Sequence, residues 1–394
     1  MPITLPTQDL WEYLSEAAAS GRSILLYGMG NGADKILAVC AARGIPVADV
    51  FASDGFVRGH SFHGRTVLSF AEACQRYDPE TMIVLLSFAS SRPEVLDIIA
   101  RVAATVETYV PDVPVVGQEL FDRAFFEANR ESIRAARALL SDEESRRVYD
   151  GILSYKLTGQ LDVLRSTESN PTEELAALLP AVNFRTVLDL GAYNGDSIRA
   201  LRPLAPQLSH VIAMEPDRRN HRKLKAYADG LATENDPLRV LCVEAGAWSS
   251  DTTLCFHDSG NRNAGLTDSP AASPASPLPS TADNPYFGKT REVCVRTPDS
   301  VVAEARASGA LPVNASVDFI KYDVEGAETE ALLGSREIIK TNAPALLVSA
   351  YHRSADLFRL PLLVHKLDPA YRLYLRRAPG VPAWDINLFA VHDA

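Results

Sequence analysis

The chain has 394 residues, 46% of them apolar and 23% charged, an ordinary composition for a globular protein that excludes a mostly disordered chain or a coiled coil. This length corresponds to about two or three domains. The formal net charge of −11 at pH 7 disfavours sequence-independent binding to nucleic acids and to anionic membranes, which carry charge of the same sign.

The lengths of the apolar runs and the spacing of the cysteines indicate whether the chain crosses a membrane and in which compartment we expect it. The longest apolar runs, such as Met82 to Leu86, are far too short to cross a membrane. The first residues lack a basic region followed by an apolar stretch, so we expect no signal peptide. The five cysteines include no Cys-x-x-Cys pair, which predicts reduced thiols, no zinc site and a cytoplasmic protein.

The first part of the chain alternates strand-like and helix-like segments. Such alternation predicts a parallel sheet covered on both faces, and we assign a Rossmann-like domain to residues 1–116. The expected strands are 23–27, 47–54, 81–88 and 106–111, and the expected helices are 31–43 and 93–103.

The remainder divides into a helical connector, residues 117–180, and a second α/β domain, residues 181–394. The fold class is therefore α/β with two Rossmann-like units. In the second unit we expect strands at 186–190, 210–215, 238–245, 317–323 and 345–351, helices at 194–201 and 217–231, and a terminal antiparallel pair at 370–377 and 385–393. The Ser, Pro and Ala-rich segment 269–285 is either a surface loop or a lid over a pocket.

The motif VLDLGAYNGDS, Val187 to Ser197, joins a buried strand to a helix through a glycine turn. Glycines allow a ligand to approach the backbone closely, and Asp189 at the strand tip would suit a ligand ammonium group. Glu215, at the tip of the next strand, is placed to accept ribose hydroxyls, and Glu244 ends the strand after that, where an adenine edge would lie. The predicted cofactor site comprises Asp189, Gly191, Ala192, Tyr193, Asn194, Gly195, Glu215, Pro216, Glu244 and Ala245.

Two alternatives exist for this turn. In the first, the glycines serve close helix–strand packing alone, and both glutamates are ordinary solvated side chains. A dinucleotide would need a small residue where Ala192 and Tyr193 stand, and its pyrophosphate would meet the bulky Tyr193. S-adenosylmethionine carries no phosphate and fits better.

Four segments together resemble the FkbM-type S-adenosylmethionine-dependent methyltransferases. They are VLDLGAYNGDS, AMEPD, DFIKYDVEGAETEALLG and LLVSAYHRSADLFRLPLLV, and the resemblance covers roughly residues 145–394. It implies a class I methyltransferase fold with a seven-stranded sheet and methyl transfer to oxygen. Functions in this family include macrolide tailoring and the decoration of glycans and glycolipids, so we expect a hydroxyl acceptor on a sugar, glycan or glycolipid.

Catalytic candidates follow the fourth and fifth strands of this unit. We expect His352 to be the general base, because an unperturbed histidine has a pKa near 6.5, with Asp323 as the alternative base or as the group that orients the acceptor. Lys321 shares a strand face with Asp323 and would lower its pKa or hold the acceptor. Glu325 is a further candidate, unless it serves the next helix turn. Hard oxygen ligands are too few here for magnesium, so no catalytic metal is expected.

A second glycine motif lies near the N-terminus. Gly28-x-Gly30-x-x-Ala33 follows a strand, and Asp54 comes 21 residues after Ala33, which fits a dinucleotide fingerprint. A nucleotide or nucleotide-sugar at Gly28, Gly30 and Asp54 is therefore possible. Alternatively, this unit has lost its ligand and supports the fold or a homodimer. The alternatives to a methyltransferase are a nucleotide-dependent oxidoreductase or nucleotide-sugar-binding protein using this unit, and a non-catalytic scaffold.

Overall fold

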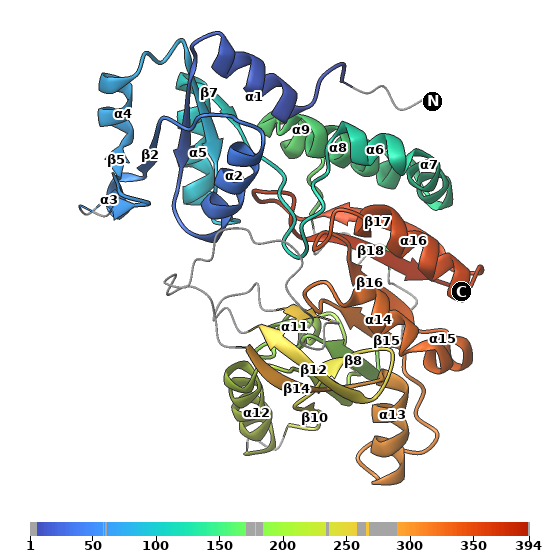
Figure 1. Cartoon of the computed structure of the whole chain (residues 1–394). Helices are drawn as coiled ribbons and strands as arrows, with labels where there is room; N and C mark the ends of the chain where they lie inside the picture. Colours follow the sequence, from blue (N-terminus) through green and yellow to red (C-terminus); the bar gives the residue numbers. More distant parts are fainter. Residues whose placement is uncertain are drawn as a thin grey trace.

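The protein is built around two open sheets, one in each half of the chain (Figure 1). The computed structural model describes residues 6–57, 59, 61–170, 178, 184–233, 236–257, 265–267 and 290–392. The predicted loop at 269–285 lies outside these residues.

The N-terminal sheet has five parallel strands in the order β5-β2-β1-β6-β7, which confirms the predicted parallel sheet. These strands are β1 (Ser23–Tyr27), β2 (Asp49–Ala52), β5 (Leu68–Ser69), β6 (Met82–Leu86) and β7 (Glu107–Tyr109). The accompanying helices are α1 (Leu10–Ala19), α2 (Asn31–Ala42), α3 (Asp54–Val57), α4 (Phe70–Arg76) and α5 (Pro93–Thr105), and a small hairpin pairs β3 (Ser61–Phe62) with β4 (Arg65–Thr66).

Three of these helices, α1, α3 and α4, were not among the expected elements. Both α1 and α4 begin with a capping box, in which Asp9 pairs with Glu12 and Ser69 pairs with Glu72. Such a box supplies hydrogen-bond partners to the free N–H groups of the first turn and so fixes the helix start. The signal was present in the sequence and could have been used.

The C-terminal sheet has seven strands in the order β10-β9-β8-β15-β16-β18-β17, as the resemblance implied. They are β8 (Thr186–Leu190), β9 (His210–Met214), β10 (Arg239–Val243), β15 (Phe319–Tyr322), β16 (Ala345–Ser349), β17 (Arg372–Arg377) and β18 (Ile386–Val391). β18 runs antiparallel to both β16 and β17, so the terminal antiparallel pair is confirmed. Its helices are α11 (Asp196–Leu201), α12 (Arg218–Thr233), α13 (Pro298–Ala307), α14 (Glu328–Leu333), α15 (Arg336–Asn342) and α16 (Asp356–Leu367).

A four-stranded sheet between β10 and α13 was not predicted. Its order is β11-β14-β12-β13, with β11 (Gly246–Ala247), β12 (Thr252–His257), β13 (Gly265–Thr267) and β14 (Thr290–Arg296). Its partners lie far apart in sequence, as in the pairing of Thr253 with Cys294. A local pattern does not reveal such pairs.

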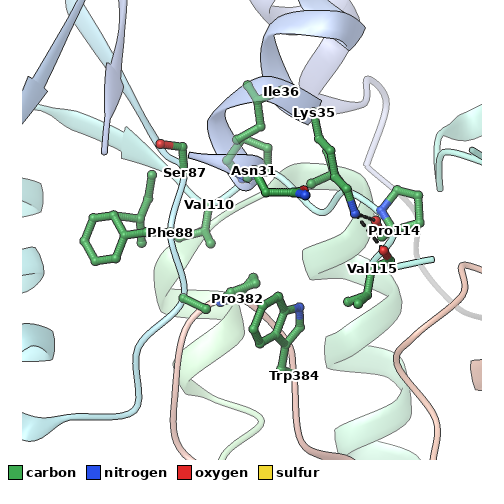
Figure 2. A pocket seen from close by; sticks show the side chains of 15 residues that line it. Asn31, Lys35, Ile36, Ser87, Phe88, Val110, Pro114, Val115, Pro382 and Trp384 are labelled. Atoms are coloured by element: carbon green, nitrogen blue, oxygen red, sulfur yellow. Dashed lines mark hydrogen bonds between the residues drawn. The ribbon is translucent and has the colours of Figure 1, made fainter. Parts of the chain in front are cut away.

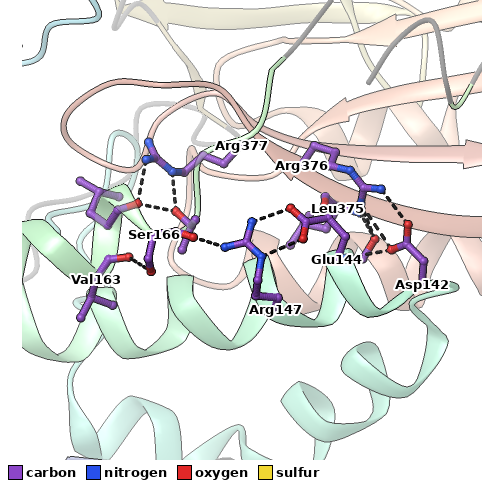
Figure 3. A network of polar contacts seen from close by, with 11 residues as sticks. Asp142, Glu144, Arg147, Val163, Ser166, Leu375, Arg376 and Arg377 are labelled. Carbon is purple, nitrogen blue, oxygen red and sulfur yellow. Dashed lines mark hydrogen bonds and ion pairs between the residues drawn. The ribbon is translucent and has the colours of Figure 1, made fainter. Parts of the chain in front are cut away.

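Helices from the connector region contact both units. They are α6 (Arg123–Ala128), α7 (Arg130–Leu139), α8 (Glu143–Thr158) and α9 (Leu161–Arg165). α8 packs on β17, and at its end the Gly159 carbonyl accepts the Val110 amide of the N-terminal unit at 2.7 Å. Figure 3 shows two buried arginines of β17 that hold α8 and α9. Arg376 pairs with Asp142 at 2.7 Å, and Arg377 donates to the Thr167 hydroxyl at 2.7 Å. Both guanidinium groups are almost fully buried, so these charge-assisted hydrogen bonds replace those that the groups would make to water in the unfolded chain.

Candidate active site

The glycine turn after β8 brings two strand tips into close contact. Gly191 has φ +83°, and a Cβ atom there would lie 1.9 Å from the carbonyl oxygen of Asp323. The amides of Gly191 and Ala192 both donate to the Met214 carbonyl at 3.0 Å. The turn is therefore fixed to β9 on one side and touches the end of β15 on the other. Because Gly195 also adopts a left-handed φ of +83°, the helix starts at Asp196 and not at the predicted 194.

Glu215 lies at the tip of β9, as predicted, and supports this turn directly. Its carboxylate accepts the Tyr193 amide at 2.8 Å and the Asp217 amide at 2.8 Å. Burial raises the pKa of Glu215 to about 7, and these two amides oppose that shift. Each carboxylate oxygen keeps a second lone pair, so the group remains able to accept ligand hydroxyls.

Asp189, near the end of β8, is a fully buried carboxylate. Among the described residues, neither of its oxygens has a hydrogen-bond partner, and Lys321 Nζ lies 3.6 Å away. Burial raises the pKa of Asp189, and Lys321 opposes that shift. A buried carboxylate that lacks hydrogen bonds is suited to a positively charged ligand.

Glu244, at the end of β10, lies apart from the contacts that fix the turn. Its side chain is 47% exposed and pairs with Arg218 at 3.1 Å and His221 at 3.7 Å. Ala245 beside it is buried. All the residues predicted for the cofactor thus stand at the ends of the adjacent strands β8, β9 and β10, where open α/β sheets bind ligands. Of the two glutamates, it is Glu215 that bonds to the glycine turn, through the Tyr193 amide.

The four predicted catalytic residues do come together, at the ends of β15 and β16. Lys321 Nζ lies 3.2 Å from Asp323 and 3.6 Å from Asp189, so one ammonium joins acids of two neighbouring strands. The sheet register explains this, because Lys321 stands directly beside Asp189. Burial raises the pKa of Asp323, but Lys321 and His352 outweigh burial and hold that pKa below its ordinary value. Asp323 is therefore an anion at neutral pH.

His352 is completely buried among carboxylates. Its Nε2 lies 3.4 Å from Glu325 and 3.7 Å from Asp323, and its Nδ1 lies 2.9 Å from Glu328. Burial lowers the pKa of the ring, yet Glu328 first and then the other carboxylates outweigh it and raise the pKa to about 10. The raised pKa favours the protonated ring at neutral pH, a form that donates hydrogen bonds from both nitrogens.

Glu328 was not among the predicted catalytic residues, yet it contacts this cluster. Its side chain is buried and accepts the amides of Val324 at 3.0 Å and Gly326 at 3.3 Å. It therefore shapes the turn that carries Glu325 and also faces His352. The spacing of three acids within six residues was the available signal.

Glu325 has the features of a poised acid–base group. Its backbone is strained, with φ +52°, a conformation uncommon outside glycine. Its side chain is 30% exposed to solvent. Burial raises the pKa of Glu325 to about 7, while His352 opposes the shift. At neutral pH such a group exchanges protons readily.

Comparison with known proteins agrees with this geometry. The model of the methyltransferase FkbM domain matches residues 189–378. These residues are an FkbM methyltransferase domain. The crystal structure of Methyltransferase FkbM from Methylobacillus flagellatus KT is similar over 98% of this chain and 94% of that chain, with a TM-score of 0.68 and 19% identity. That likeness shows a shared fold, N-terminal unit included.

Two further solved structures are more distant. A precorrin-6y C5,15-methyltransferase from Geobacter metallireducens GS-15 has a TM-score of 0.33 and 10% identity, over 56% of this chain and 86% of that one. An O-methyltransferase from Bacillus cereus has a TM-score of 0.32 and 11% identity, over 67% and 97%. No curated protein matches the sequence significantly. The comparisons favour the methyltransferase over the oxidoreductase alternative.

The N-terminal glycine motif is packed differently from that of the FkbM domain. Gly28 has φ +115°, and a Cβ atom there would lie 2.6 Å from the ring of Phe88. Gly30 precedes α2 with open space around its Cα, and Asp54 begins α3. A nucleotide or nucleotide-sugar at these residues stays a prediction. Nearby, the His63 side chain is 56% exposed and pairs with Asp34 at 2.6 Å.

Within the ranges that the structure describes, no group of three or more His, Cys, Asp or Glu side chains is arranged to hold a metal ion. In the same ranges, no helix is long and apolar enough to span a membrane.

Proposed function

We propose that the chain is an S-adenosylmethionine-dependent O-methyltransferase that acts on a hydroxyl of a sugar, glycan or glycolipid. One observation supports this most strongly: Lys321 pairs with Asp189 on the cofactor side and with Asp323 on the acceptor side. The two predicted half-sites are therefore adjacent parts of one polar site. A hydroxyl acceptor suits that polarity better than an apolar group would.

S-adenosylmethionine, when bound, supplies a methyl group on a positively charged sulfur. The residues present fit such a ligand, because Asp189 is an unsatisfied buried carboxylate and Glu215 holds the turn while keeping free lone pairs. We assign the cationic amino acid part of the ligand to Asp189 and its ribose to Glu215. Turn residues Gly191 to Gly195 would line the ligand between them.

The acceptor hydroxyl must lose its proton during transfer, and we assign Glu325 as the base that accepts this proton. His352 was the expected base, but three carboxylates keep it protonated, so we assign it the task of holding Glu325 and Asp323 in place. Asp323, an anion, would accept a hydrogen bond from a neighbouring hydroxyl of the acceptor and so align the reacting oxygen beside Glu325. Because Glu325 is partly exposed, it can pass the proton on to water. A base of this kind contributes about 10²–10⁴-fold to rate.

Calorimetric titration with S-adenosylhomocysteine tests the donor site, beside NAD, NADH and UDP. We expect micromolar binding of S-adenosylhomocysteine alone, lost in Glu215→Ala and kept in Glu16→Ala, an exposed glutamate of α1. Binding of only NAD or UDP would contradict the proposal and move the working site to the N-terminal unit.

A methylation assay tests the acceptor class. Incubation with labelled S-adenosylmethionine and a panel of sugars, glycans and glycolipids should label a product that resists mild base, as an ether does and a methyl ester does not. Base-labile label on an acidic acceptor would contradict transfer to a hydroxyl.

A further inference from the structure

A cavity lies where the N-terminal sheet meets the loop between β17 and β18 (Figure 2). On the sheet side it is lined from the start of α2, by Asn31 and Lys35, and from the segment after β6, by Ser87 and Phe88. β1 and β6 are neighbours at the point where the chain changes direction across the sheet. Such a switch point is where open α/β sheets bind ligands. The opposite wall comes from the other unit, by way of Trp384.

Lys35 is the one cation among the residues that line this cavity. Its ammonium donates to the carbonyls of Pro114 at 2.8 Å and Val115 at 2.7 Å, which leaves one of its three N–H groups free (Figure 2). Burial alone lowers the pKa of Lys35, since no described carboxylate pairs with it. Two acids directly adjoin lining residues in the sequence and are already paired: Asp34, beside Lys35, with His63, and Asp112, beside Val113, with Lys156.

The other walls are largely apolar and the space is small. Phe88, Val110 and Trp384 border a cavity of about 80 Å³. Apolar walls weaken the competition from water and so strengthen the attraction between an ammonium and an anion. A space of this size fits a small charged group and not a whole dinucleotide, whose pocket would measure several hundred Å³.

Two connections join this cavity to the proposed catalytic residues. The carbonyls that Lys35 holds directly precede Val116, whose amide donates to the His352 carbonyl at 2.9 Å. A Cβ atom on Gly326 would lie 3.1 Å from Val116, so Val116 also packs on the turn next to Glu325. On the other side, the Trp384 ring stacks on Tyr351, with centroids 6.4 Å apart, and Tyr351 contacts the His352 ring at 4.1 Å.

We propose that this cavity binds an oxyanion of the acceptor, a carboxylate or a phosphate, at a distance from the hydroxyl that is methylated. The inference rests on the proposed function and names its substrate class as acid-bearing sugars. The free N–H of Lys35 pairs with the anion, and Trp384 covers the adjoining ring. Binding energy at this remote group holds the hydroxyl beside Glu325 and Asp323, which raises the rate of transfer as well as the affinity.

The test is tryptophan fluorescence and calorimetry on the full chain, with D-glucuronate, D-glucose 6-phosphate and uncharged D-glucose as probes. We expect saturable binding of at least one of the two acids and none of glucose. Lys35→Met should weaken that binding by about tenfold or more, the size of one charge-assisted hydrogen bond. Lys340→Met, on the exposed end of α15, is the matched control and should leave it unchanged.

A second variant keeps the test valid if Lys35→Met fails to fold. Asn31→Asp adds a negative charge to the cavity wall and leaves the bonds from Lys35 to Pro114 and Val115 intact. It should weaken binding of the acids several-fold. Equal affinity in wild type, Lys35→Met and Asn31→Asp would overturn the proposal, and so would the absence of saturable binding by both acids.

The same preparation separates this inference from the proposed function. If S-adenosylhomocysteine binds and neither acid does, the methyltransferase stands and the anion site is wrong. If an acid binds in a Lys35-dependent way and S-adenosylhomocysteine does not, the anion site stands and the donor site is wrong. Binding of glucuronate alone identifies a carboxylate as the anion, and binding of glucose 6-phosphate alone identifies a phosphate.

Discussion

The two halves of this chain place a glycine turn after a central parallel strand, yet surround it with opposite chemistry. In the FkbM domain, the turn at Gly191 adjoins three ionisable side chains, Asp189, Lys321 and Glu215. In the N-terminal unit, the turn at Gly28 meets the ring of Phe88. The same backbone arrangement thus serves a polar site in one unit and close packing in the other.

A glycine motif therefore indicates a backbone conformation and does not by itself indicate a bound ligand. Both motifs need a positive φ at their first glycine, +83° at Gly191 and +115° at Gly28. What separates them is the side chains that neighbouring strands present. Function resides in those side chains, so the fold alone does not assign it.

The largest contrast is expected for alanine at a glycine of each turn. Gly191→Ala should prevent folding, because the new methyl would overlap the Asp323 carbonyl, 1.9 Å away, and losses beyond about 4 kcal/mol come from such clashes. Gly30→Ala meets nothing within 4 Å and suffers only from its φ of +103°, at a cost of about 1–3 kcal/mol. Urea unfolding of both variants measures the difference. Equal losses would mean that the two turns are equally constrained.

The next effect concerns chemistry found in the FkbM domain alone. Glu325→Gln should lower kcat by about 10²–10⁴-fold with unchanged S-adenosylhomocysteine affinity, because the proton acceptor is lost. In the wild type, kcat/KM should rise as pH rises through about 7, where Glu325 ionises, and the variant should lack this limb. Glu330→Gln, five residues further along the chain in α14, is the control. If His352→Gln abolishes the limb and Glu325→Gln retains it, the original assignment of His352 is correct.

A smaller effect follows from the buried imidazolium. The pKa of His352 rises from 6.5 to about 10 on folding. Between these values the folded state binds more protons at His352 than the unfolded state does. The contribution of His352 to the free energy of unfolding is therefore largest below pH 6.5 and is lost as pH rises towards 10. The free energy of unfolding should drop by at least about 1 kcal/mol over this window. His352→Gln should flatten the slope and His365→Gln should not; a slope unchanged in His352→Gln would show a neutral ring.

The smallest effect is expected for metal removal. Asp323 and Glu325 already face Lys321 and His352, which neutralise the charge that a divalent cation would need. EDTA should therefore leave turnover unchanged. Loss of activity that magnesium restores would show that the polar site exchanges its cationic side chains for a metal.

Local sequence determined both sheets and most of the polar site. Apolar runs separated by amphipathic segments are a local property, so β1, β6, β8 and β15 were predictable, and so was the antiparallel end of the second sheet. Strand tips in a parallel sheet meet at one edge, so Asp189, Glu215 and Asp323 could be assigned to the same edge before any coordinates. Capping boxes at Asp9 and Ser69 were equally local and would have added two helices.

Tertiary structure alone decided the charges and the shared cavity. The pKa near 6.5 of an isolated ring led to the prediction of His352 as base, whereas the neighbouring carboxylates of Glu328, Glu325 and Asp323 raise that pKa to about 10. The cavity joins Lys35 to Trp384, two residues at opposite ends of the sequence. A pKa and a cavity both depend on the summed effect of groups close in space, and no spacing along the chain encodes that sum.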